Sequence, residues 1–151
     1  MTHILSARTV VTAASIGAPA AILWNPHGTN RVRCFKYSWF KTVATLDFLA
    51  IARVTARGTA STTTTPSLEN SYRRDTSNFS GIVLDTAWSV APTIAAAATY
   101  GNRWVGPAAI GAGFVWPFIG EYIIPPGTGL AIVAAQAVAL QPGDVTFEFD
   151  D

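Results

Sequence analysis

The sequence predicts an all-β fold, an antiparallel β-sandwich of jelly-roll type, and three observations predict it. Apolar and polar residues alternate with a period of two in several segments, as they do in half-buried strands. Nine prolines and twelve glycines separate these segments at short intervals. No segment shows a long apolar pattern with the 3.6-residue period of a helix. Short strands joined by Pro/Gly turns are typical of sandwiches and jelly rolls.

The clearest strand is at the C-terminus, where Val145, Phe147 and Phe149 alternate with polar residues. Residues 31–40 place Phe35, Tyr37 and Trp39 on one face, with Val32, Cys34, Lys36 and Ser38 on the other. Residues 48–57 place Leu49 and Ile51 opposite Phe48, Ala50, Ala52 and Val54. Further strands are expected at Ala20–Trp24, Ile82–Trp88, Gly113–Phe118, Glu121–Ile124 and Leu130–Ala135, with a helical turn at Ala95–Ala98.

The chain is long enough for one domain with a single core, which we expect to span residues 19–151. Two segments fit such a sandwich poorly. Residues 1–18 are interpreted as an extended N-terminal arm or an edge strand. Residues 58–81 form a predicted long loop, which begins with a Thr/Ser tract and has few core-forming residues. A loop of this length is usually functional or disordered, and here it either reaches a neighbouring subunit or is simply solvated.

Charged residues make up only 13% of the chain, compared with about 25% in an average globular domain. Such a chain either buries part of its surface against copies of itself or covers that surface with Thr and Ser. The formal net charge is +1 and the basic residues are scattered, which excludes a general attraction to nucleic acid or to an anionic membrane.

Two segments superficially resemble targeting or membrane signals. Residues 9–23 follow Arg8 and are apolar, but Thr, Ser, Gly and Pro interrupt them, so we expect no cleaved signal peptide. Residues 122–143 carry no charge, but a Pro-Pro-Gly-Thr-Gly run at 125–129 would break a membrane helix. No membrane association is expected.

The residues that usually carry catalysis are sparse, and no catalytic residue, cofactor, metal site or small-molecule substrate is predicted. The only histidines, His3 and His27, have no metal-ligand partner at the usual spacing. No G-x-S-x-G motif is present, and the Gly-x-Gly pairs lack the residues of a phosphate-binding loop. Cys34 lies in an apolar run and is expected to be a buried, inert thiol. The chain is therefore predicted not to be an enzyme.

Six residues are predicted to contact a partner. The second half of the 58–81 loop supplies aromatic and basic side chains, and an Arg-Trp pair precedes the turn at 106–107. The residues are Tyr72, Arg73, Arg74, Phe79, Arg103 and Trp104. Most of the five tryptophans are expected in the core. Trp104 is the one expected at a surface, where an exposed indole ring could alternatively stack on a sugar.

Several segments together resemble the small structural proteins of tailed-phage virions, in particular capsid decoration (cement) proteins. They are AAILWNP at 20–26, RVTARG at 53–58, YRRD at 72–75, EYIIPPGTGL at 121–130 and VTFEFDD at 145–151. The resemblance implies a β-sandwich or jelly-roll homotrimer that binds the major capsid protein where capsid subunits meet. It also implies a location on the capsid surface, after synthesis in the cytoplasm of the bacterial host.

Two alternative functions remain open on the sequence. The first is another virion component with the same fold, such as a tail, baseplate or head-fibre protein. The second is a carbohydrate- or receptor-binding module.

Overall fold

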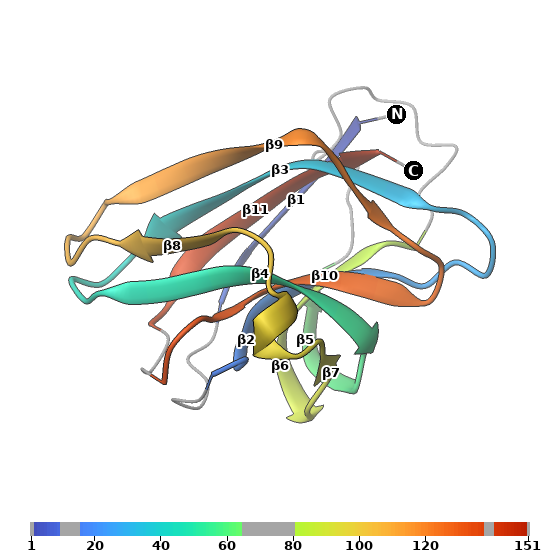
Figure 1. The fold of residues 1–151 in the computed structure, drawn as a ribbon, viewed down its shortest axis with the longest axis horizontal. Coiled ribbons are helices and arrows are strands. Elements are labelled where there is room, and N and C mark those ends of the chain that lie inside the picture. The colour runs from blue at the N-terminus through green and yellow to red at the C-terminus, as the bar shows by residue number, and fades with distance from the viewer. Residues whose placement is uncertain (1, 10–15, 65–80, 138–140, 151) are drawn as a thin grey trace.

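The computed structural model describes residues 2–9, 16–64, 81–137 and 141–150, which fold into two antiparallel sheets packed face to face (Figure 1). The first sheet has the strand order β1-β11-β3-β9. Its strands are β1 (Thr2–Arg8), β11 (Gly143–Asp150), β3 (Val32–Lys41) and β9 (Gly113–Ile124).

The second sheet has the order β5-β6-β2-β10-β4-β7, and β8 pairs with β4 beside β7. Its strands are β5 (Thr59–Thr64), β6 (Val83–Val90), β2 (Pro19–Asn25), β10 (Thr128–Ala134), β4 (Asp47–Ala56), β7 (Thr93–Ile94) and β8 (Arg103–Gly106). A short 3₁₀ helix, η2 (Ala97–Thr99), lies between β7 and β8, at the predicted helical turn. Among the described residues, no helix has the length and hydropathy needed to cross a bilayer.

The strand order is that of a jelly roll, as the sequence predicts. The first sheet, β1-β11-β3-β9, and the central strands of the second, β2-β10-β4-β8, have the two four-stranded arrangements of that fold. The chain passes repeatedly from one sheet to the other, so strands distant in sequence become neighbours. The segment β5–β6–β7–η2 is an insertion between β4 and β8.

The main core lies between the sheets and confirms most of the predicted alternation. Val145, Phe147 and Phe149 of β11 are buried, and the residues between them are partly exposed. In β3 the predicted alternation fails at Phe35. Cys34 and Lys36 each pair with a residue of β11 and of β9, but Phe35 between them pairs with neither strand, so it forms a bulge. The extra residue reverses the alternation. Val32 and Cys34 therefore face the core together with Tyr37 and Trp39, while Phe35 is half-buried.

A second hydrophobic cluster occupies the other face of the second sheet. The chain turns sharply between β4 and β5 at Gly58, which has a φ of +71° and would clash with the carbonyl oxygen of Val90 if it carried a Cβ. Because β5 pairs with β6 and β6 with β2, the insertion curls beneath the sheet (Figure 1). The cluster contains Ile22, Trp24, Ala50, Ala52, Val54, Val83, Ala131 and Val133, with Trp88, Ile94, Tyr100 and Ala135 packed against it. Two apolar clusters in one chain account for part of its low charge content.

The structure describes part of each of the two segments, 1–18 and 58–81, that fit the predicted sandwich poorly. Residues Thr2–Arg8 form the edge strand β1, which pairs with β11 along its whole length and buries Leu5. Within the predicted 1–18 segment, these residues are thus a strand at the edge of the first sheet. The start of the predicted 58–81 loop is strand β5. Residues 65–80 lie outside the described residues.

Candidate interaction surfaces

One end of the sandwich carries four chain connections without a single charged residue. They run between β1 and β2 (9–18), β3 and β4 (42–46), β8 and β9 (107–112), and β10 and β11 (135–142), and none contains Asp, Glu, Lys, Arg or His. In the jelly-roll topology the described residues of all four lie at the same end, on the left of Figure 1. We call their described residues the uncharged end: 9, 16–18, 42–46, 107–112, 135–137 and 141–142.

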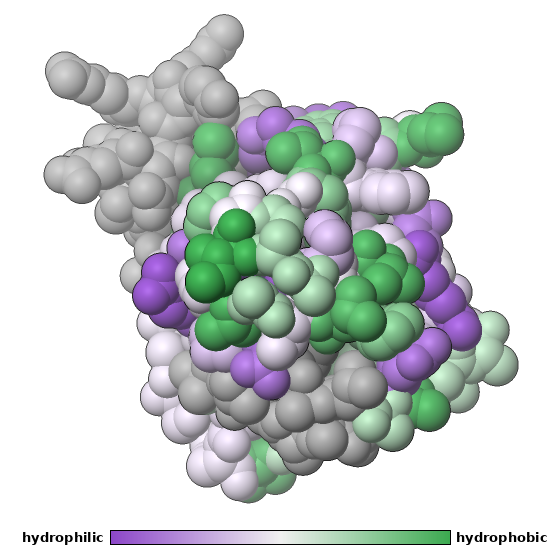
Figure 2. Space-filling view, turned by 90° about the vertical axis from the view of Figure 1, so that its left-hand side faces the viewer, coloured by the Kyte–Doolittle hydropathy of each residue, from purple (hydrophilic) through white to green (hydrophobic). Residues whose placement is uncertain are grey.

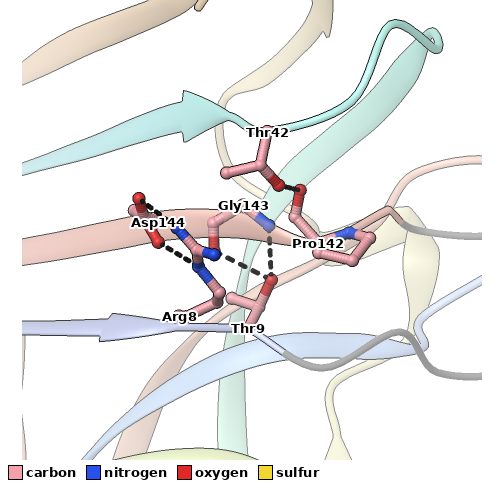
Figure 3. A network of polar contacts seen from close by, with 6 residues as sticks. All are labelled: Arg8, Thr9, Thr42, Pro142, Gly143 and Asp144. Atoms are coloured by element: carbon pink, nitrogen blue, oxygen red, sulfur yellow. Dashed lines mark hydrogen bonds and ion pairs between the residues drawn. The ribbon is translucent and has the colours of Figure 1, made fainter. Parts of the chain in front are cut away.

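Hydrogen bonds between uncharged groups fix these connections to one another (Figure 3). The Thr9 hydroxyl donates to the carbonyl oxygen of Gly143 (3.1 Å) and accepts from the Gly143 N–H (3.0 Å). The Thr42 hydroxyl donates to the carbonyl oxygen of Pro142 (2.6 Å). Thr9 thus joins the β1–β2 connection to the first residue of β11, and Thr42 joins the β3–β4 connection to the residue before it, with no charged side chain. Their backbone polar groups are partly satisfied inside the protein, which lowers the cost of covering this end with an apolar partner.

A buried ion pair lies next to the uncharged end, at the two ends of the β3–β4 connection. The Lys41 ammonium lies 3.1 Å from the Asp47 carboxylate, with both side chains about 1% exposed, and it also donates to the carbonyl oxygen of Thr45. The Lys41 backbone bonds to Ala112 and Gly111, which belong to the β8–β9 connection. Lys41 thus anchors two of the four connections. A surface ordered before binding loses less conformational entropy when a partner arrives.

Large apolar side chains project from the uncharged end. Ile110 is 71% exposed and Leu46 is 50% exposed, although each lies in an ordered connection. Figure 2 looks onto this end and shows hydrophobic side chains gathered across its centre, with hydrophilic ones towards its flanks. The apolar surface continues onto the adjoining sheet, where Phe40 and Val115 are also exposed and border a shallow hollow of about 440 Å³. An ordered apolar surface of this kind is typical of an interaction site.

The outer face of the first sheet is different, because its neighbouring strands are joined by ion pairs. Arg8 of β1 pairs with Asp144 of β11 (2.9 Å), and Lys36 of β3 pairs with Glu148 of β11 (2.5 Å). The guanidinium of Arg33 pairs with Asp150 (2.5 Å) and, at 3.7 Å, with Glu121 of β9. We call this the charged face: Arg8, Arg33, Lys36, Glu121, Asp144, Glu148 and Asp150.

A groove of about 690 Å³ lies along β9, where that strand bulges. Between Pro117 and Tyr122, which pair with Lys36 and Cys34, four residues of β9 stand opposite Phe35 alone. Gly120 makes this possible with a φ of +87°, and Ile119 protrudes completely into solvent (108% exposed). The groove therefore lies at an edge of the sandwich and is accessible from solution.

The groove combines aromatic walls with polar groups that are incompletely bonded. Trp116 and Tyr122 are half-buried in its lining. The Arg53 guanidinium lies 5.2 Å from the Tyr122 ring centroid and donates one hydrogen bond, to the carbonyl oxygen of Ile123. The Asn102 side-chain amide has no hydrogen-bond partner among the described residues, and Glu121 contributes a carboxylate to the lining.

Six residues are predicted from the sequence to contact a partner. The structure describes two of them, Arg103 and Trp104, and both lie in β8. Arg103 is exposed, donates to the carbonyl oxygen of Ala97 (2.6 Å) and lies over the Tyr100 ring. Trp104 is half-buried, and its ring packs on Tyr37, Phe114 and Trp116. Trp104 is therefore no exposed platform. The other four, Tyr72, Arg73, Arg74 and Phe79, lie outside the described residues.

The uncharged end has a signal in the sequence that the predicted interface residues do not include. Every second connection of a jelly roll meets at the same end, so the absence of charge from 42–46 and 107–112 together predicts an apolar surface. The tryptophans follow their prediction in part: Trp24 and Trp39 are buried, whereas Trp88, Trp104 and Trp116 are half-buried.

The described residues hold no group of three or more His, Cys, Asp or Glu side chains arranged to bind a metal ion. Cys34 is completely buried, as predicted, and burial raises the pKa of its thiol far above the ordinary value. The thiol therefore stays protonated at neutral pH and is a poor nucleophile.

Comparison of the chain with protein-family models, with curated proteins and with solved structures found no match.

Proposed function

We propose that the chain is a non-enzymatic structural protein of a phage virion, a capsid decoration (cement) protein. In this role it forms a homo-oligomer, a trimer in the simplest case, on the capsid surface and binds across neighbouring subunits of the major capsid protein. The observation that carries the proposal is the uncharged end, with Leu46 and Ile110 exposed on hydrogen-bonded connections. The jelly-roll fold and the sequence resemblance agree with it.

The uncharged end suits permanent contact better than exposure to water. Leu and Ile side chains gain about 25 cal/mol for each Å² of apolar area removed from water. An apolar contact of ~800 Å² would therefore contribute roughly 20 kcal/mol before the entropy of association is subtracted. Because Thr9, Thr42 and Lys41 already hold the described residues around them by hydrogen bonds, those residues need little further ordering. Repetition over the symmetric sites of a shell would multiply the effect.

The mass of the purified chain in solution tests self-association directly, by light scattering after size exclusion. We expect a trimer or another closed oligomer. The double variant Leu46→Lys/Ile110→Lys places two charges in the apolar surface and should shift the population to monomer. Val90→Lys is the matched control, because the exposure of Val90 (58%) lies between those of Leu46 and Ile110 but Val90 is outside the uncharged end.

A monomeric wild-type protein at every soluble concentration would overturn the self-association part of the proposal. An oligomer that Leu46→Lys/Ile110→Lys leaves intact would overturn the assignment to the uncharged end.

The place of the protein in the particle distinguishes decoration from the tail, baseplate or head-fibre alternative. Electron microscopy of the native assembly would find a decoration protein in many symmetric copies over the shell. A few copies at one vertex or on the tail would favour the alternative component.

A further inference from the structure

We propose that the groove beside the β9 bulge binds a neutral oligosaccharide. This site is independent of the uncharged end, and the proposal goes beyond a structural role. It develops the carbohydrate-binding alternative but moves it from Trp104, which does not line the groove, to Trp116 and Tyr122, which do.

The groove has the combination of surfaces that a sugar requires. A pyranose ring presents C–H groups on its faces and hydroxyl groups around its rim. Half-buried aromatic rings such as those of Trp116 and Tyr122 pack against the faces. The hydroxyl groups both donate and accept hydrogen bonds, so they need both kinds of partner nearby. A volume of about 690 Å³ is in the range of small-ligand sites.

The polar groups of the groove provide both kinds of partner. A guanidinium has five N–H groups. Among the described residues, that of Arg53 donates one hydrogen bond, to the carbonyl oxygen of Ile123. The Asn102 amide can donate and accept, and the Glu121 carboxylate accepts. Arg53 and Glu121 carry opposite charges, so the lining has no net charge. A neutral ligand therefore fits the groove better than an acidic one.

Two other occupants are less suitable for this lining. An extended peptide would have to pair with the free edge of β9, but Pro117 and the following bulge interrupt the regular edge there. A purely apolar protein surface would bury the Asn102 amide and the remaining N–H groups of Arg53 without hydrogen-bond partners, at a cost of about 1–3 kcal/mol for each group. A hydroxyl-rich ligand avoids both difficulties.

The test is binding of the full chain to an array of immobilised neutral and acidic oligosaccharides, followed by titration of any hit with tryptophan fluorescence as the signal. Trp116→Ala, Arg53→Gln and Asn102→Ala should each weaken binding by roughly tenfold or more. Arg103→Gln is the matched control, because that arginine also lies over a tyrosine ring but does not line the groove. Its affinity should equal that of the wild type.

Thermal unfolding of each variant establishes that it is folded, and Arg53→Gln and Asn102→Ala test the groove if Trp116→Ala unfolds. No binding on the array, or binding that Arg53→Gln and Asn102→Ala leave unchanged, would overturn the proposal. Binding confined to acidic sugars would also overturn it. Because oligomeric mass is measured separately, either proposal can fail without the other.

Discussion

The charged face and the uncharged end belong to the same domain but expose different kinds of side chain to water. On the charged face, strands β1, β11, β3 and β9 are joined by ion pairs between partly exposed side chains. At the uncharged end, Leu46 and Ile110 are exposed, and the hydrogen bonds of the connections use threonine hydroxyls and backbone groups.

The difference shows that the low charge content of the chain is not spread evenly. The charged residues of the first sheet are concentrated where strands lie side by side and face solvent. A single mutation in one of the four connections would suffice to introduce a charge, yet none contains one. Polar and apolar surfaces separated in this way favour contact through the apolar part and solvation through the charged part.

The largest expected effect concerns the ion pair beneath the uncharged end. Asp47→Ala leaves the Lys41 ammonium buried without its counter-charge, which should lower the free energy of unfolding by about 3–5 kcal/mol. Urea denaturation followed by tryptophan fluorescence measures the change. The double variant Lys41→Met/Asp47→Leu removes both charges and should restore most of the stability. A double variant as unstable as Asp47→Ala would mean that the loss is due to packing rather than to the unpaired charge.

A smaller effect compares the same substitution at two leucines. Leu5 of β1 is completely buried, so Leu5→Ala should cost about 2–5 kcal/mol of unfolding free energy. Leu46 is half-exposed at the uncharged end, so Leu46→Ala should change stability by no more than about 0.5 kcal/mol while weakening self-association. Denaturation and light scattering separate the two readouts. Equal stability losses would contradict the division into core and contact surface, and a neutral Leu5→Ala would restore the interpretation of 1–18 as a dispensable arm.

The smallest effect is expected on the charged face. Glu148→Gln removes one partner of Lys36 from a partly exposed pair, which should cost about 0.2–1 kcal/mol in low salt. The cost should shrink in 1 M NaCl, because ions at about that concentration screen charges over a few ångströms. Denaturation of both proteins at the two salt concentrations measures it. A loss above about 2 kcal/mol that salt does not reduce would show that the charged face contributes to folding as a buried network does.

Much of the fold could be predicted because local pattern and tertiary environment agree. Val145, Phe147 and Phe149 alternate in the sequence and are buried together in the structure. Leu49 and Ile51 point to one cluster, and Ala50 and Ala52 to the other, as their period of two requires. The bulge at Phe35 was not predictable, since it depends on how β9 and β11 pair with β3.

The candidate sites were predicted less well, because each is built from segments that are distant in the sequence. Trp104 precedes a turn, which suggested an exposed ring, but β8 pairs with β4 and places that ring among Tyr37, Phe114 and Trp116. The groove brings Arg53 of β4 together with Trp116 and Tyr122 of β9. Nothing in the spacing of these residues indicates that they meet.

The sequence by itself determined the fold class and the scarcity of charge, because strand periodicity and turn residues are local and composition needs no structure. Only the tertiary structure decided which parts of the surface lack charged residues. Strand pairing curled part of the second sheet around a second hydrophobic cluster and brought the described residues of four uncharged connections to one end. The physical reason is that a jelly roll pairs strands far apart in the chain. Neighbours on the surface are therefore set by strand order and register, which are not written in any local stretch of sequence.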